Sequence, residues 1–387
     1  MTTAIKPFEQ PVYVTRPLLP DLQSLSRKLA EVWESKWLTN NGPQHALLEE
    51  KIRSYLKVQH ISLFNNGTIA LITAIRSLRL YGEVITTPFT FPATPHVLSW
   101  NNIRPIFCDI DPVTMNIDPK KIESMITPQT TGVLAVHVFG TPCDVEAIQQ
   151  IADRYGLKVV YDAAHAFGVE IDGRGIGTFG DISMFSFHAT KLFHTAEGGA
   201  LAFNNPNMKP RVDLLKNFGI KNEDEVVMPG INGKMNEIQA ALGLVLLGQV
   251  DEERLKRQRL IDAYLALLKD VDGIHVNHAL PGVKSSCQYF VIRIEEKRFG
   301  ISRDEVYERF KQYNVFTRKY FYPLCSEYTC YRQLPSSAPD NLPVAHAVVQ
   351  EVLSMPLYGG LSLDDVERLC AILKSFRRGV IGCGKNA

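Results

Sequence analysis

Residues 159–201 read VVYDAAHAFGVEIDGRGIGTFGDISMFSFHATKLFHTAEGGAL, and this stretch indicates the fold. An apolar run ends at Asp162, and a second run, 182–186, precedes a loop of small and polar residues around Lys191. Short runs that are apolar throughout are typical of strands buried on both faces of a parallel sheet. In open α/β sheets, ligands bind in the crevice at the carboxyl ends of the strands. The stretch therefore predicts an α/β fold with Asp162 and Lys191 at a ligand-binding edge.

The same alternation extends outward from this stretch, from about residue 47 to residue 201. The candidate strands are residues 61–63, 83–86, 105–107, 132–137, 158–161, 182–186 and 200–203. Between them, residues 68–79, 94–100, 119–126 and 145–155 have apolar positions at helical spacing. This order predicts crossover helices around a central, mostly parallel sheet.

The composition changes after Leu247, where residues 251–268 form a charged amphipathic stretch followed by turn signals. We predict a large domain over residues 1–248 and a smaller C-terminal α+β domain over residues 249–387. In the second domain we expect a strand at 289–294 and helices at 302–313 and 363–375, the last with an N-cap at Ser362.

The overall charge gives no sign of a nucleic-acid partner. The 387 residues contain 42 Lys+Arg and 41 Asp+Glu, a net charge of +1, whereas a basic balance is typical of nucleic-acid binding. The chain lacks a signal-peptide pattern at its start and any apolar run of the ~18 residues that span a bilayer. Its seven cysteines are scattered without C-x-x-C spacing. We therefore expect a cytoplasmic protein with reduced thiols and no membrane segment.

Asp162 and Lys191 suit one kind of chemistry. A lysine amine can form a Schiff base with a carbonyl, and partial burial lowers its pKa so that the neutral nucleophile is populated. A carboxylate facing a protonated pyridine nitrogen keeps that ring cationic, which makes the ring an electron sink. The spacing of the two residues does not prove these roles, and Asp162 could instead be a helix N-cap.

Two further stretches fit a phosphate and a planar ring. At Phe64-Asn65-Asn66-Gly67-Thr68 a short strand leads into a helix, whose N-terminal N–H groups and threonine hydroxyl suit a phosphate. The alternative is that Thr68 is an ordinary N-cap. In residues 87–94, TPFTFPAT, an aromatic side chain after a strand could stack on a ring or pack in the core.

The residue types in the sequence also allow three other functions. Residues 175–180, GIGTFG, fit the dinucleotide fingerprint G-x-G-x-x-G, but they follow a turn and lead into a strand, whereas the fingerprint lies between a strand and a helix. Asp162, His165, His188 and His194 could serve a metal hydrolase, although no metal-ligand spacing is present. A non-catalytic protein that senses a ligand is the third alternative.

A family resemblance is carried by seven motifs, in the family's order from about Thr39 to Leu247: NNGT, TTPFTFPAT, FCDIDP, VHVFGTPCDVEAI, YDAAHAFG, SFHATKLFHTAEGG and PGINGKMNEIQAALG. This set resembles the DegT/DnrJ/EryC1/StrS family of pyridoxal-phosphate sugar aminotransferases. The C-terminal third matches loosely. The resemblance implies the aspartate-aminotransferase-like fold, fold type I, with pyridoxal 5'-phosphate as cofactor.

The resemblance also implies residue roles. Lys191 is similar to the lysine that carries the cofactor and shuttles protons, and Asp162 to the partner of the pyridine nitrogen. Phe91 resembles the aromatic that stacks on the ring, and His165 would lie near its phenolic edge. Positions that hold the phosphate are matched by Gly67, Thr68, Ser186 and, from the other subunit, Asn232. The last match implies a homodimer with shared active sites, and retention of Lys191, which dehydratase members replace by histidine, favours transamination.

For substrates, the family implies L-glutamate as amino donor and a nucleotide-linked keto sugar as acceptor. Residues 36–43, with Thr39 and Asn40, resemble the segment that lies over the sugar in members that aminate C4 of a dTDP-4-keto-6-deoxyhexose, as in O-antigen lipopolysaccharide synthesis. Amination at C3 is the alternative. Arg318, Lys319 and Tyr320 are candidates for binding the nucleotide diphosphate, against the alternative that they are solvated surface.

Overall fold

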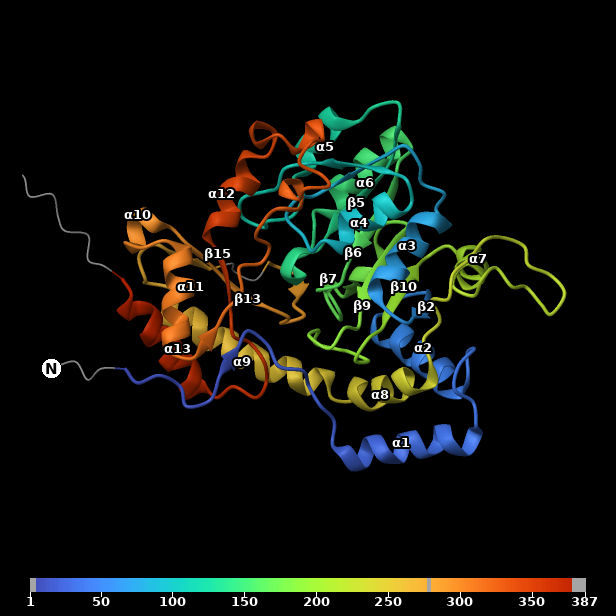
Figure 1. Ribbon diagram of the computed structural model, residues 1–387, viewed down its shortest axis with the longest axis horizontal. Coiled ribbons are helices and arrows are strands. Elements are labelled where there is room, and N and C mark those ends of the chain that lie inside the picture. The colour runs from blue at the N-terminus through green and yellow to red at the C-terminus, as the bar shows by residue number, and fades with distance from the viewer. Residues whose placement is uncertain (1–4, 277–279, 378–387) are drawn as a thin grey trace, which may run out of the picture.

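A seven-stranded sheet forms the centre of the larger unit in the computed structural model, which describes residues 5–276 and 280–377 (Figure 1). In spatial order its strands are β2 (His60–Phe64), β10 (Gly199–Phe203), β9 (Ile182–Ser186), β6 (Lys158–Asp162), β5 (Thr130–Val136), β3 (Glu83–Thr86) and β4 (Arg104–Phe107). Strand β10 runs antiparallel to β2 and β9, and the other strand pairs in this sheet are parallel. The predicted mostly parallel sheet is confirmed, because each predicted strand falls on one of these seven.

Helices cover both faces of the sheet, and the alternation of side chains along β5 shows how. Val133 and Ala135 pack in the cluster that contains α6 (Val145–Tyr155), and Leu134 packs in the cluster that contains α3 (Gly67–Ser77). On the α3 face lie also α4 (Ala93–Trp100) and α7 (Met208–Leu215). On the α6 face lie α2 (Pro43–Tyr55) and α8 (Glu237–Leu247). Successive strand residues point to opposite faces, so apolar runs without polar interruption are required here.

Local capping sets where several helices begin. The side chains of Asp144 and Ser362 accept hydrogen bonds at the starts of α6 and α13 (Leu363–Ser375), and Asn236 forms a capping box with Gln239 at the start of α8. Such bonds satisfy backbone donors that have no partner inside the helix. The predicted N-cap at Ser362 is therefore confirmed.

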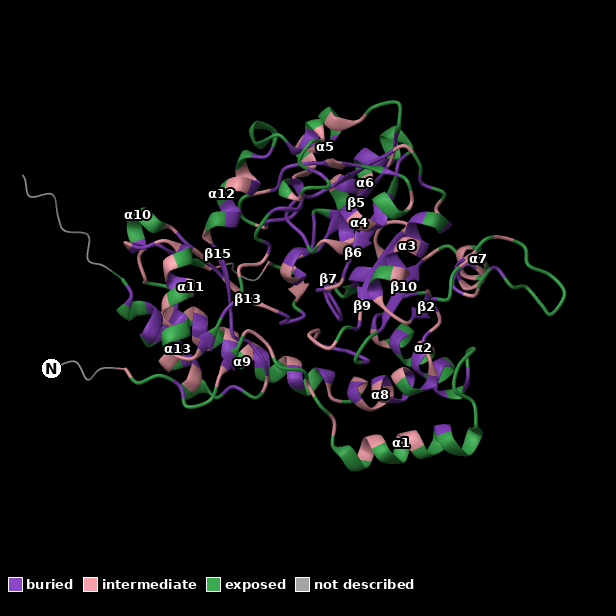
Figure 2. Ribbon diagram, in the orientation of Figure 1, coloured by how far each residue is buried: buried purple, intermediate pink, exposed green. Residues whose placement is uncertain are grey.

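The C-terminal unit has its own antiparallel sheet, formed by β11 (Ile274–Val276), β13 (Phe290–Ile294) and β15 (Val352–Met355). Its helices are α9 (Val250–Leu268), α10 (Glu296–Phe299), α11 (Arg303–Gln312), α12 (Pro343–Glu351) and α13. Figure 2 shows buried segments running through both units. The remaining helices are α1 (Leu22–Ser35) and the short α5 (Pro119–Ile122).

The N-terminal residues pack with the C-terminal unit. Phe8 and Val12 belong to its apolar cluster, and β1 (Val12–Tyr13) pairs in parallel with β14 (Val315–Phe316). A second small sheet joins β12 (Val283–Lys284) to β7 (Glu170–Ile171) and β8 (Arg174–Gly175). The boundary at residue 248 stays a prediction, but the first residues of the predicted large domain lie against the other unit.

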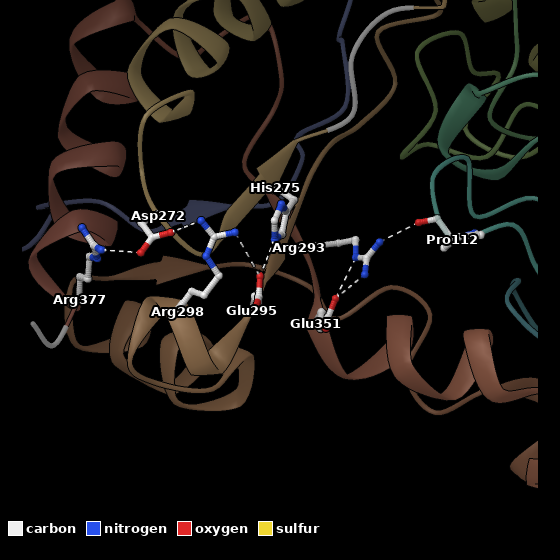
Figure 3. A network of polar contacts seen from close by, with 8 residues as sticks. All are labelled: Pro112, Asp272, His275, Arg293, Glu295, Arg298, Glu351 and Arg377. Atoms are coloured by element: carbon white, nitrogen blue, oxygen red, sulfur yellow. Dashed lines mark hydrogen bonds and ion pairs between the residues drawn. The ribbon is translucent and has the colours of Figure 1, made fainter. Parts of the chain in front are cut away.

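Polar contacts also link the two units. In Figure 3, Arg293 of β13 binds Glu351 and donates from Nη1 to the carbonyl of Pro112 at 2.7 Å. In the same view, a second set of contacts lies within the C-terminal unit: Asp272 binds Arg298 and Arg377, which links the end of α13 to the loop before β11. Asp109, which follows β4, is buried and accepts from the N–H groups of Val344 and Ala345 at the start of α12.

Within residues 5–276 and 280–377, no helix has the length and apolar character that crossing a bilayer requires. The six cysteines in that part of the chain are free thiols, and Cys383 lies outside the described residues.

Asp109→Ala should reduce the free energy of unfolding by about 2–3 kcal/mol. Its carboxylate accepts from the two N–H groups of α12 and from Lys121 at 2.7 Å, and hydrogen bonds to a charged group are each worth roughly 1.5–3 kcal/mol. Denaturant unfolding measures the change. The exposed Asp340, in the 3-10 turn before α12, is the matched control, and Asp340→Ala should change stability by less than about 0.5 kcal/mol. Equal effects of the two variants would contradict the linking role of Asp109.

Candidate active site

A cavity of about 640 Å³ opens at the carboxyl ends of the sheet strands. Its walls come from the start of α3, the loop after β3, the end of β6 and the loop after β9, with Tyr289, Tyr320 and Phe321 added by the C-terminal unit. Eight of the predicted site residues line it: Gly67, Thr68, Phe91, Asp162, His165, Ser186, Lys191 and Tyr320. Residues far apart in the sequence thus meet at the edge where α/β sheets bind ligands.

Lys191 lies half-buried in the loop between β9 and β10. Within the described part of the chain no side chain or carbonyl accepts a hydrogen bond from its Nζ, which lies 5.9 Å from the ring centroid of Tyr289. Burial lowers the pKa of Lys191 to about 8, although the charges of Asp162 and Tyr320 oppose the shift. A substantial fraction of this amine is therefore neutral near pH 8 and able to act as a nucleophile or base.

Asp162 ends β6 and is buried. Its Oδ2 accepts from the hydroxyl of Thr94 at 2.9 Å, and its Oδ1 accepts from the N–H of Ala164 at 3.0 Å. Burial raises the pKa of Asp162, against the two hydrogen bonds and the charge of Lys191. The alternative that Asp162 caps a helix is wrong, because the chain continues from it in turns.

The start of α3 forms a cradle beside this pair. Its N-cap is Asn66, whose side chain accepts from the N–H of Ile69 at 2.8 Å, so the alternative that Thr68 is the cap is wrong. A Cβ at Gly67 would lie 3.1 Å from Cβ of Ser186, and one at Gly199 would lie 2.8 Å from the backbone of Gly67. Glycine at both positions therefore lets the start of α3 pack closely against β9 and β10. The N-terminus of α3 lines the cavity, and the helix dipole there favours an anion.

Aromatic side chains form the rest of the wall. Phe91 is 57% exposed at the cavity, which rules out the alternative that it packs in the core. His165 is buried, lies parallel to Phe321 with centroids 5.8 Å apart, and accepts at Nδ1 from the N–H of Phe139. Burial and the charge of Lys191 hold the pKa of His165 well below its usual 6.5. The ring is therefore neutral, with its hydrogen on Nε2.

Five predicted residues lie away from the cavity of their own chain. Thr39 and Asn40 are exposed in the loop between α1 and α2, and Asn232 is exposed in the loop after α7. After β14, Arg318 is exposed and Lys319 is partly buried. Their roles stay predictions. For Asn232 the prediction itself assigns the side chain to the other subunit.

Sequence reasoning missed Thr94, Tyr289 and Phe321. Thr94 also bonds to Thr90 at 2.8 Å, and this i,i+4 pair of threonines beside Phe91 was the available signal. Tyr289 lies 4.9 Å from the ring of His165, measured between centroids, but no local pattern distinguishes it from a strand residue.

The residues present fit pyridoxal phosphate. A lysine amine that is partly neutral, a buried carboxylate, an exposed aromatic ring and an anion-binding helix start line one cavity. These are the groups that an aldehyde, a pyridine nitrogen, an aromatic ring and a phosphate require.

A comparison with protein families matches residues 22–374 to the DegT/DnrJ/EryC1/StrS aminotransferase family. The chain belongs to this family. The dTDP-4-amino-4,6-dideoxy-D-glucose transaminase of Escherichia coli is 48% identical over 366 residues, which cover 94% of this chain and 98% of the relative. The transaminase of the same name from Shigella dysenteriae is 44% identical over 96% of this chain and 100% of its own.

Solved structures of DegT/DnrJ/EryC1/StrS proteins have the same fold. DesI, crystallised in the presence of its TDP-sugar product, matches with a TM-score of 0.91 at 37% identity, over 96% of this chain and 94% of that one. PseC of Helicobacter pylori, an aminotransferase involved in pseudoaminic acid biosynthesis, matches with a TM-score of 0.89 at 30% identity, over 95% and 99%. The predicted family and fold type I are confirmed, and the family match extends through the C-terminal third, where the motifs were weak.

The other interpretations fit the structure poorly. Residues 175–180 run from the end of β8 through a 3-10 turn toward β9, so they do not lie between a strand and a helix as a dinucleotide fingerprint does. His194 bonds to the carbonyl of Leu18 and His188 to Thr190. In the described residues no three His, Cys, Asp or Glu side chains come together as a metal site.

In the cofactor-free protein, Lys191 should titrate near pH 8. Its rate of acetylation, measured by competitive labelling and mass spectrometry, should rise up to about pH 8 and then level off, whereas an ordinary surface lysine continues to gain reactivity toward ~10.4. Asp162→Asn should move the Lys191 profile to lower pH, because the carboxylate that favours the ammonium form is removed. A Lys191 profile like that of surface lysines would refute the burial of the amine.

Proposed function

We propose that this protein is a pyridoxal-phosphate aminotransferase that moves an amino group from L-glutamate to the C4 keto group of a dTDP-4-keto-6-deoxyhexose, forming dTDP-4-amino-4,6-dideoxyglucose. The observation that carries the proposal is that Lys191 and Asp162 line the same cavity of a family aminotransferase. The choice of sugar rests on the two transaminase relatives at 48% and 44% identity and on DesI, which was crystallised with its TDP-sugar product.

When bound, pyridoxal phosphate supplies an aldehyde that takes up the amino group and a ring that draws electrons from the donor carbon. Lys191 would hold the cofactor through Nζ, and Asp162 would pair with the ring nitrogen. Gly67, Thr68 and Ser186 would bind the phosphate at the start of α3, and Phe91 would cover the ring. Neutral His165, with its hydrogen on Nε2, would donate to the ring's phenolic oxygen.

Lys191 also has the pKa that proton transfer requires. Once the amino donor has taken its place on the cofactor, the freed Nζ, with its pKa lowered to about 8, would take the proton from the α-carbon of the donor and return one to the acceptor. The aromatic rings of Tyr289 and Phe321 would shield that carbon from water on one side. General acid–base catalysis of this kind contributes roughly 10²–10⁴-fold.

The sugar-binding residues would come from both chains of a homodimer. Thr39 and Asn40 lie in an exposed loop just before α2. The start of α2 is anchored by Glu237, whose carboxylate accepts from the N–H groups of Gln44 and His45 at 2.7 and 2.9 Å. We assign this loop, and Asn232, to the cavity of the partner chain. Tyr320 and Arg318 would contact the nucleotide diphosphate. The free thiols fit a reaction in the cytoplasm.

Apolar side chains around Asn232 support the dimer. Phe218, Val226 and Val227 are 47%, 67% and 40% exposed on the segment between α7 and α8, which extends from the body of the molecule (Figure 1). Leu22 and Trp33 of α1 are 74% and 64% exposed. Large apolar side chains left exposed on one segment are typical of a surface that meets another protein chain.

The substrate assay tests the proposal directly. Incubation with glutamate and a panel of dTDP-, UDP- and GDP-linked keto sugars should yield the C4 amine of the dTDP sugar, identified by NMR, with release of 2-oxoglutarate. A C3 amine would replace this acceptor assignment by the C3 alternative. A protein that binds the sugar without any amination would favour the ligand-sensing alternative.

Lys191→Ala should abolish steady-state transamination, because the variant lacks the amine that moves the proton. Lys269→Ala, at an exposed lysine that ends α9, is the matched control and should keep full turnover. Product formation by the Lys191→Ala variant would contradict the mechanism.

Shared sites predict complementation between inactive variants. Asn232→Asp places a negative charge where the partner's phosphate would bind, and should inactivate the homodimer. A purified heterodimer of a Lys191→Ala chain and an Asn232→Asp chain contains one site with both residues intact, so it should regain activity that neither homodimer has. An inactive heterodimer would show that Asn232 serves the cavity of its own chain or none.

A further inference from the structure

The loop that carries Lys191 has no regular structure to hold it. Residues 187–198 between β9 and β10 are turns and bends. Contacts within the loop hold its start, since the N–H of Lys191 donates to the carbonyl of His188 at 2.8 Å. Leu192 and Phe193 are buried in the apolar cluster beneath it. This packing holds the loop against the core. Among the described residues, no strand of the sheet hydrogen-bonds to the peptide groups beside Lys191.

One side chain from the C-terminal unit supplies these hydrogen bonds. The Oε1 of Gln288 accepts from the N–H of Leu192 at 2.5 Å, and its Nε2 donates to the carbonyl of Thr190 at 2.9 Å. The amide therefore bonds to the peptide group on each side of Lys191. Gln288 is only 3% exposed, so water does not compete for these bonds. In the described residues no other group outside the loop bonds to the main chain of Thr190, Lys191 or Leu192.

The segment that contains Gln288 is shaped to reach this loop. Cys287 has a positive φ of 52°, and its thiol points to Gln258 of α9. On either side of it, Ser286 donates to the carbonyl of His165 at 2.8 Å and Gln288 bonds to the lysine loop. Tyr289 follows, with its ring beside His165 and Nζ of Lys191. One short segment before β13 thus touches two of the residues around the cavity.

We propose that Gln288 is a positioning residue for Lys191: its side-chain amide fixes the two peptide groups that flank the lysine and so aims Nζ at the reacting carbon. The proposal rests on the proposed function, because it assumes that Lys191 moves the proton. A displacement of about 1 Å in a catalytic group can reduce a rate about 100-fold. Loss of both hydrogen bonds should therefore slow proton transfer without displacing the cofactor.

Gln288→Met tests this, since methionine has a similar length and lacks both hydrogen-bonding groups. With cofactor bound, the single-turnover reaction with glutamate, followed by absorbance in a stopped-flow instrument, should be about 10- to 100-fold slower at saturation. The glutamate concentration for half-maximal rate and the amount of bound cofactor should stay unchanged. Gln288→Asn, shorter by one methylene, reaches at most one of the two partners and should fall between wild type and Gln288→Met.

Hydrogen exchange gives a readout independent of activity. In the cofactor-free protein, the Leu192 amide should exchange faster in Gln288→Met than in wild type, measured by mass spectrometry on peptides that span residues 187–196. Cys287→Ser is the matched control, because it changes the neighbouring buried residue, whose side chain faces α9. It should leave both the rate and the exchange of Leu192 as in wild type.

The outcomes separate this proposal from the proposed function. If wild type does not react with glutamate, the proposed function fails, and the exchange measurement still tests whether Gln288 holds the loop. If wild type reacts and Gln288→Met reacts at the same saturated rate, the positioning role is wrong. An equal slowing in Cys287→Ser would also overturn it, because the effect would then be a general loosening of the segment.

Discussion

The site depends on the burial of an amine and a carboxylate beside each other at one edge of the sheet. Strand β6 runs parallel to β9, with Asp162 opposite Met184. The chain that continues from β9 toward Lys191 therefore begins beside Asp162. Burial raises the pKa of Asp162 and lowers that of Lys191, so each group is less ionised than in water even though they attract each other. A ligand that brings a cation to the carboxylate and takes up the neutral amine relieves both penalties. The electrostatics of the cleft therefore fit the chemistry of the proposed cofactor.

The cavity is closed by residues that the sheet does not carry. Tyr289, Tyr320 and Phe321 belong to the C-terminal unit, and Arg293 and Asp109 hold that unit against the sheet. The aromatic rings exclude water from one side of Lys191, while Gln288 bonds to its loop. The C-terminal unit is therefore part of the site, and a change in how it packs on the sheet would reach Nζ through Gln288 and Tyr289.

The sequence predicts the sheet well because its strands are buried on both faces. Their segments are apolar throughout, and this composition alone distinguishes them from amphipathic helices. Asp162 and Lys191 are recognisable because they follow two of these runs. Thr94 and Gln288 are not, since a threonine in a turn and a glutamine before a strand have many ordinary uses, and only the tertiary contacts single them out. For the same reason the packing of Phe8 and Val12 on the C-terminal unit escapes prediction, because their partners lie far away in the chain.

A second chain is required for the proposed roles of Thr39, Asn40 and Asn232. Each is exposed, yet each sits on a segment with an ordered anchor: Glu237 holds the start of α2, and the main chain of Asn232 accepts from the side chain of Asn65. Exposed polar residues on anchored segments are suited to contact with a second chain. The exposed Phe218, Val226 and Val227 lie on the same segment as Asn232, so the apolar contact that would stabilise the proposed dimer is the contact that would deliver the asparagine. Association and completion of the site would then be a single event, and a separated chain would retain the lysine and the carboxylate but lack part of the anion-binding shell.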